Sequence, residues 1–203
     1  MSDVMDDVKK IEIIGTIKDG IAIGSKNIGP ILVNILLWIL TCWIPYLNVG
    51  TTIGMFIGII TKAARNEPIP MTEIFDRKYR KYMGEYFLTS GLVGVGVAVG
   101  YIFFIVPGII ISIGWMFAPF LAIDKGKNPS EAITISNQVT YGNKGRIFGV
   151  LFLISLVFSV LCSILAIIPV IGPVLAFLGI LFLMFVVVGI QSSLYKQLVD
   201  AVY

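Results

Sequence analysis

Few side chains in this chain are equipped for chemistry. The 203-residue sequence contains no histidine, so it lacks the usual general base near neutral pH and the commonest metal ligand. Its two cysteines, Cys42 and Cys162, lie inside apolar runs, where free cysteine usually serves as a small packing residue. The sequence shows no glycine-rich phosphate loop and no nucleophile elbow. We therefore expect no catalytic residue, no cofactor and no metal site.

The polar residues nearest to the apolar segments offer only weak candidates. An enzyme acting at the membrane surface would have to use Glu85, Asp124 or Glu131, but carboxylates beside Lys and Arg usually balance those charges. Proton relays and ion-coupled carriers need ionisable residues at membrane depth, and the apolar segments contain none. Asn34 is the most notable polar residue there. It is a candidate pathway residue, with a packing hydrogen bond as the alternative.

The composition indicates which elements must hold these residues. The chain is 57% hydrophobic and 13% charged, with mean hydropathy +0.95, whereas a soluble domain carries about 25% charged residues. We conclude that this is an integral membrane protein. Its 15 basic and 12 acidic residues all fall in four stretches: 1–26, 62–85, 124–146 and 196–200.

The three uncharged segments between these stretches each predict a helical hairpin. Each is longer than the roughly 20 residues of one membrane span and carries a proline near its centre. Pro45, Pro107 (followed by Gly108) and Pro169 follow one another at intervals of 62 residues, which suggests an internal repeat. The predicted spans are 28–44, 47–61, 86–106, 109–123, 147–168 and 174–195. The second and fourth are short, so we expect them to extend into the charged stretches.

The charged stretches predict amphipathic helices at the lipid interface. Between the first two hairpins, aromatic and basic side chains alternate at helical spacing, which suits the headgroup plane. The predicted interface residues are Phe75, Arg77, Lys78, Tyr79, Arg80, Lys81 and Tyr82. A second helix follows Asn128, with Pro129 at its first position and Gly142 as its stop. The candidate repeats of the single membrane domain are 1–65, 66–127 and 128–203, each an interfacial helix followed by a hairpin.

The distribution of basic residues predicts the topology. All 15 lie on the side opposite the three predicted turns, which places both termini in the cytoplasm, with the chain in the cytoplasmic (inner) membrane. The fold class is therefore all-α, with six transmembrane helices as three Pro-turn hairpins and amphipathic helices on the cytoplasmic side. A first hairpin that is re-entrant instead of spanning is the alternative.

Glycines on the third predicted span indicate close helix packing. Gly91, Gly94, Gly96 and Gly100 lie on it, and the last two form a GxxxG pair. The partner is either another hairpin of the same chain or a second copy in a homo-oligomer.

The stretch from Phe104 to Phe148 resembles a large family of uncharacterised prokaryotic multi-pass membrane proteins. That family is similar to the membrane-anchor domain found beside glycerophosphodiester phosphodiesterases. The matching features are Pro107-Gly108, the region Trp115 to Pro119, the "PSEAI" helix at 129–133 and the "GNKGRIF" motif. The resemblance implies a six-helix bundle with interfacial helices. It implies no catalytic activity, since no soluble phosphodiesterase domain is attached.

These features predict a non-enzymatic scaffold that organises lipids or proteins, as a homo-oligomer. The expected partners are membrane lipids, further copies of the chain and other membrane proteins, and no nucleic acid. A pore, or the membrane subunit of a transporter or exporter, is the alternative, because uncharged pathways lined by Ser, Thr and Gly exist.

Overall fold

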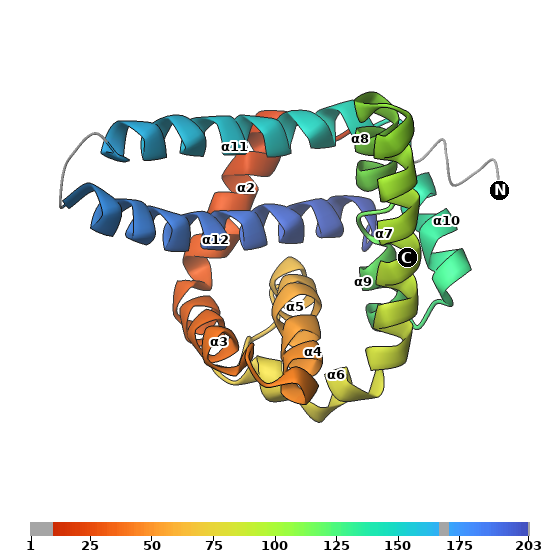
Figure 1. Ribbon diagram of the computed structural model, residues 1–203, viewed down its shortest axis with the longest axis horizontal. Helices are drawn as coiled ribbons and strands as arrows, with labels where there is room; N and C mark the ends of the chain where they lie inside the picture. Colours follow the sequence, from red (N-terminus) through yellow and green to blue (C-terminus); the bar gives the residue numbers. More distant parts are fainter. Residues whose placement is uncertain (1–9, 167–170, 203) are drawn as a thin grey trace.

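The computed structural model describes residues 10–166 and 171–202, and the regular structure within them is entirely helical (Figure 1). The elements are α2 (Ile13–Lys26), α3 (Ile28–Thr41), α4 (Pro45–Ile53), the π-helical turn η1 (Gly54–Gly58), α5 (Ile59–Ala64), the 3-10 turn η2 (Glu73–Phe75), α6 (Arg77–Lys81), α7 (Met83–Phe103), α8 (Ile105–Gly114), α9 (Ala118–Asp124), α10 (Pro129–Val139), α11 (Lys144–Ala166) and α12 (Ile171–Leu198).

Five helical segments in the described part of the chain are long and apolar enough to cross a membrane. Two of them, Pro45–Ala64 and Ile105–Asp124, extend the second and fourth predicted spans into the charged stretches, as expected. The first predicted span differs, because α3 has 14 residues, about 21 Å of helix. It meets α2 at a bend of 76°, so the pair is either one broken span or a re-entrant segment.

Two of the three predicted turn prolines lie in the first turn of a helix in the described residues. Pro45 occupies the first turn of α4, directly after the α3–α4 connection. Between α7 and α8 the reversal occurs at the extended residue Phe104, and Pro107 and Gly108 lie in the first turn of α8. Gly108 is required there because a Cβ would lie 2.5 Å from the Tyr101 ring. Pro169 lies outside the described residues.

The long apolar helices do not all run alongside one another. In Figure 1, α7 runs across the direction of α11 and α12. Of the most apolar 18 residues in each span, 11% are buried in α7 and in α11, against 67% in Pro45–Ala64. Apolar helix faces gain little from one another in lipid, so only faces with small or polar residues pack tightly.

Glycines allow a very close contact where α2 crosses α12. A Cβ on Gly20 would lie 2.8 Å from the backbone of Ile190, and one on Gly24 would lie 2.6 Å from the carbonyl oxygen of Phe185. Gly189 of α12 meets the Gly20 carbonyl group from the other side. The crossing requires residues without side chains, so it determines where α2 lies.

Helix α10 compensates for the break between α8 and α9. The Ser136 hydroxyl donates to the Gly114 carbonyl (2.8 Å) and accepts from the Phe117 N–H (3.1 Å), so backbone groups freed by the break stay bonded. The predicted cap of α10 is confirmed, since Asn128 accepts a hydrogen bond from the Glu131 N–H. Gly142 adopts φ +75°, as a helix-terminating glycine does.

Candidate functional site

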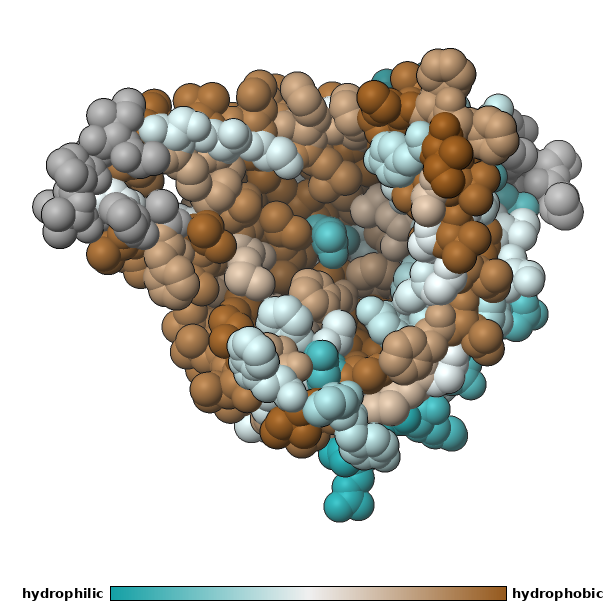
Figure 2. Space-filling model, in the orientation of Figure 1, coloured by the Kyte–Doolittle hydropathy of each residue, from teal (hydrophilic) through white to brown (hydrophobic). Residues whose placement is uncertain are grey.

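Most ion pairs of the described residues gather where the hairpins meet. We call this region the polar junction: Lys62, Arg65, Glu73, Asp76, Lys78, Tyr79, Asp124, Lys125, Tyr195 and Asp200. These residues come from the ends of α5, α9 and α12 and from η2 and α6. We call the long apolar helices α7, α11 and α12 the arms. In Figure 2, apolar surface covers α11 and α12, whereas hydrophilic groups lie near α6 and α10.

Arg65 joins the ends of α5, α9 and α12. Its guanidinium pairs with Asp124 through both carboxylate oxygens, one at 2.9 Å, and with Asp200 at 2.9 and 3.1 Å. Lys125 also bonds Asp200 (2.9 Å), and the Tyr195 hydroxyl donates to Asp124 (2.7 Å). Hydrogen bonding to Asp124, and next to Asp200, raises the pKa of Arg65. The guanidinium therefore stays charged, and four of its five N–H donors are occupied within the fold.

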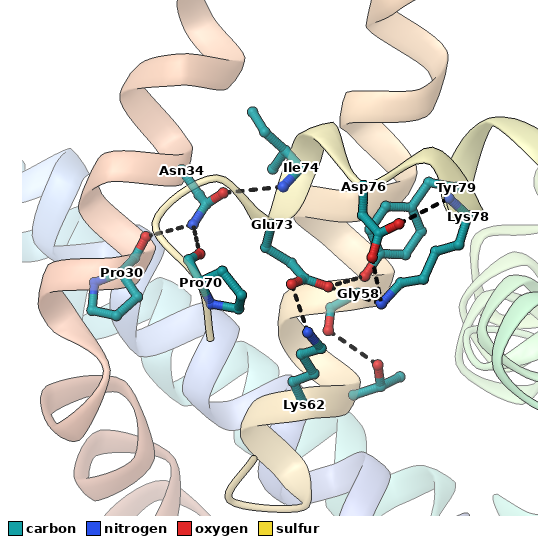
Figure 3. A network of polar contacts seen from close by, with 11 residues as sticks. Pro30, Asn34, Gly58, Lys62, Pro70, Glu73, Ile74, Asp76, Lys78 and Tyr79 are labelled. Atoms are coloured by element: carbon teal, nitrogen blue, oxygen red, sulfur yellow. Dashed lines mark hydrogen bonds and ion pairs between the residues drawn. The ribbon is translucent and has the colours of Figure 1, made fainter. Parts of the chain in front are cut away.

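Glu73 is the centre of a second cluster (Figure 3). Its carboxylate is 2% exposed and accepts hydrogen bonds from Lys62 (2.6 Å), Lys78 (3.0 Å) and the Tyr79 hydroxyl. Burial opposes ionisation, but these three hydrogen bonds outweigh it and hold the pKa of Glu73 below its usual value. The carboxylate is therefore a buried anion that is stabilised by two ammonium groups and one hydroxyl donor.

The predicted interface residue Tyr79 lies inside the fold, and its assignment to the lipid interface was wrong. The side chain is 3% exposed, and its ring lies on Gly54 and Gly58 of the π-helical turn. A Cβ on either glycine would collide with this ring. The prediction assumed one amphipathic helix through residues 75–86, whereas the structure has a 3-10 turn, an Asp76 cap and a break at Tyr82.

The other predicted interface residues do lie on or near the surface. Arg77, Arg80 and Lys81 are exposed and have no ion partner among the described residues. Phe75 and Tyr82 are half-buried against the core, and Lys78 is shared between the surface and Glu73. The short helix α6 therefore presents three unpaired cations beside the polar junction.

Asn34 holds a loop in place. Its buried amide group donates to the carbonyl oxygens of Pro30 and Pro70 (both 2.9 Å) and accepts from the Ile74 N–H (3.1 Å), as Figure 3 shows. Both amide hydrogens are thus used, and the side chain faces the segment that leads into η2. This arrangement matches the packing alternative.

The four glycines of α7 divide into two pairs. Gly96 lies against the Trp115 ring, and Gly100 against Ile111 and the backbone of Gly108, so the GxxxG pair serves packing within the chain. Gly91 and Gly94 face open space. Packing within the described chain therefore accounts for Gly96 and Gly100 and not for Gly91 and Gly94.

The cysteines and acidic residues show no further cluster. Cys42 and Cys162 are free and half-buried. Within residues 10–166 and 171–202, no three Cys, Asp or Glu side chains gather as metal ligands would.

Two features of the described structure were absent from the sequence prediction, namely the glycine contact between α2 and α12 and the Arg65 cluster. The Gly20–Gly24 pair has the GxxxG spacing that was noticed on α7, so the same pattern could have identified it. The Arg65 cluster joins residues 59 and 135 positions apart, and no local pattern indicates such a contact.

No family model, curated protein or solved structure matches this chain. The resemblance to the uncharacterised membrane family therefore stays a prediction.

Proposed function

We propose that this protein is a non-enzymatic, multi-pass scaffold of a prokaryotic cytoplasmic membrane, which self-associates and organises lipids or other membrane proteins. The observation that carries the proposal is the low burial of α7 and α11. Only 11% of the residues in the apolar 18-residue segment of each helix are buried. Such faces need lipid or another protein to cover them. The polar groups, by contrast, are largely paired with one another.

Self-association is supported by the open face of α7. Gly91 and Gly94 have no neighbour within 4 Å of a Cβ position, which leaves a shallow face between large apolar side chains. The exposed large side chains of this helix include Phe87, Leu88, Leu92, Val95 and Ile102. In lipid, helices associate through such small-residue faces, because the backbones can approach closely.

The proposed topology follows from the positive-inside rule. Seven basic residues lie in or beside the polar junction, so we place this side, with both termini, in the cytoplasm; they are Lys62, Arg65, Lys78, Lys125, Arg77, Arg80 and Lys81. The six-span arrangement, the Pro-turn hairpins and the threefold repeat belong to the same proposal.

The non-enzymatic role is supported by the pairing of two of the three candidate carboxylates. Asp124 is bound by Arg65 and Tyr195, and Glu131 by Lys127 at 2.8 Å. The alternative of a pore or transporter subunit receives no support from Asn34, whose amide hydrogens are already bonded within the fold.

The mass of the purified protein in mild detergent tests the proposal. We expect a multiple of the 22.2 kDa chain mass, reduced toward one chain by Gly94→Leu, which fills the open face. Gly84→Leu is the matched control, because Gly84 also faces open space but lies at the start of the helix. A strictly monomeric wild-type protein that binds neither lipid nor partner would rule the proposal out.

A further inference from the structure

A cavity of about 250 Å³ opens between α5, α6 and the end of α9. Two ammonium groups line it, Lys62 from α5 and Lys78 from α6, together with the Tyr82 ring and Gly58 of the π-helical turn. Neither the scaffold role nor the ion pairs of the hairpin ends explain a space at this position. The cavity lies beside the charged surface of α6, so it is reached from the side where lipid headgroups or cytoplasmic solutes would be.

The ammonium groups of Lys62 and Lys78 have N–H donors that are not used in hydrogen bonds among the described residues. An ammonium carries three N–H donors. Lys62 uses one on Glu73 at 2.6 Å, and Lys78 contacts Glu73 at 3.0 Å and Asp76 at 3.3 Å. The Tyr82 hydroxyl makes no hydrogen bond to another described residue. The cavity wall therefore offers at least three unused N–H donors and one hydroxyl to a ligand.

The Glu73 carboxylate keeps the two ammonium groups close together. It is buried behind the cavity and accepts from Lys62, Lys78 and Tyr79, so one anion draws two cations to the same place. This carboxylate fixes the cations in advance, and a ligand need not order them. Arg65 also lines the cavity, but Asp124 and Asp200 occupy four of its five N–H donors.

Three cations (Lys62, Arg65 and Lys78) and two carboxylates (Glu67 and Asp124) line the cavity, and both lysines are paired with acidic residues outside its lining. The excess of positive charge comes from the adjoining surface. Arg77, Arg80 and Lys81, on the same helix as Lys78, add three positive charges without ion partners among the described residues. Clustered ammonium groups act as point charges that suit the tetrahedral, multiply charged phosphate group.

We propose that this cavity binds the phosphate group of an anion, held by Lys62, Lys78 and Tyr82. The phosphate belongs either to the headgroup of an anionic lipid or to a soluble phosphate. The cavity and its donors do not depend on self-association, and the membrane scaffold role bears only on which source is used.

Calorimetric titration of the full-length protein in a non-ionic detergent tests the proposal. The probes are short-chain phosphatidylglycerol, phosphatidylcholine with the same acyl chains, and inorganic phosphate. We expect phosphatidylglycerol to bind more tightly than phosphatidylcholine, because the lysines repel the choline group. Tighter binding of phosphatidylglycerol than of inorganic phosphate assigns the site to lipid, and the reverse order assigns it to soluble phosphate.

Three variants locate the binding. Lys78→Gln should weaken binding about tenfold, as loss of a charge-assisted hydrogen bond does. Tyr82→Phe should weaken it about threefold, as loss of a neutral hydrogen bond does. The control is Lys81→Gln, which removes an equal charge from the same helix outside the cavity, and it should change the affinity less than about twofold.

Equal losses in Lys78→Gln and Lys81→Gln would overturn the proposal, because they would indicate surface attraction without a site. Absence of binding by all three probes would also overturn it. Thermal unfolding of each variant, with a cooperative transition well above the titration temperature, shows that the fold is intact. The mass of the protein in detergent is recorded separately, so that failure of self-association is distinguished from failure of the phosphate site.

Discussion

The polar junction and the apolar arms of the hairpins are built on opposite principles. At the polar junction, Arg65 holds residues at the ends of α9 and α12, and Glu73 is enclosed by three donors. At the α2–α12 crossing, glycines bring the two helices together. In the apolar 18-residue segments of α7 and α11, only 11% of the residues are buried. The junction is therefore complete within one chain, and the arms need their surroundings. It follows that substitutions at the junction should affect folding, and substitutions on the arms should affect association.

The largest expected effect separates two glycines. Gly24→Leu should prevent folding or destabilise the chain by more than about 3 kcal/mol, because even a Cβ would lie 2.6 Å from the Phe185 carbonyl oxygen. Gly91→Leu, on the open face of α7, should leave the stability within about 0.5 kcal/mol. Thermal unfolding in a detergent that keeps the chain monomeric measures both. Similar losses in the two variants would erase the distinction between the regions.

Removal of the Arg65 clamp should give the next largest effect. Arg65→Met leaves Asp124 and Asp200 with Tyr195 and Lys125 only, and should cost about 2 kcal/mol, reduced from the fully buried case because the site is partly exposed. The matched control is Arg77→Met, which removes an exposed cation without an ion partner among the described residues. If the two variants unfold at the same temperature, the clamp does not hold the hairpins together.

A smaller effect is expected from the hydroxyl of Tyr79. Tyr79→Phe removes one of three donors to buried Glu73 and should cost about 1 kcal/mol. Tyr82→Phe, which removes a hydroxyl without such a bond, should cost less than about 0.5 kcal/mol. Chemical unfolding curves of the two variants make the measurement. A larger loss in Tyr82→Phe would contradict the buried position of Tyr79.

The smallest expected effect is a dependence on pH. The folded-state pKa of Glu73 lies below its usual value of 4.5, so its contribution is complete above that pH and is lost as pH falls through the folded-state pKa. Wild-type protein should therefore lose thermal stability below about pH 4 more steeply than Glu73→Gln. Glu85→Gln, which alters an exposed carboxylate, should follow the wild type. Parallel profiles for wild type and Glu73→Gln would remove Glu73 from the junction's stabilising groups.

The sequence predicted the arms better than the junction. Long uncharged runs predict apolar helices because the bilayer requires about 20 apolar residues per span, and the extension of the second and fourth spans followed from the same length. The start of α10 also followed from local pattern, with Asn128 as its cap and Pro129 at its first position.

The junction depends on contacts that local patterns do not encode. The bonds from Arg65 to Asp124 and Asp200 join distant parts of the sequence, and each residue alone resembles an ordinary surface charge. Tyr79 fits an amphipathic pattern equally well whether it faces lipid or the π-helical turn, and only the glycines opposite it decide between the two. Tertiary packing, not periodicity, therefore determined the candidate site.

Disulfide cross-linking in native membranes tests most directly the claim that the arms are covered by a second copy of the chain. In a Cys42→Ala, Cys162→Ala background, Gly94→Cys places a thiol on the open face of α7, and Thr89→Cys places one on the buried side of the same helix. We predict that oxidation converts Gly94→Cys into a dimer at low expression, and leaves Thr89→Cys monomeric. Absence of a Gly94→Cys dimer, or equal cross-linking at both positions, would contradict self-association through this face.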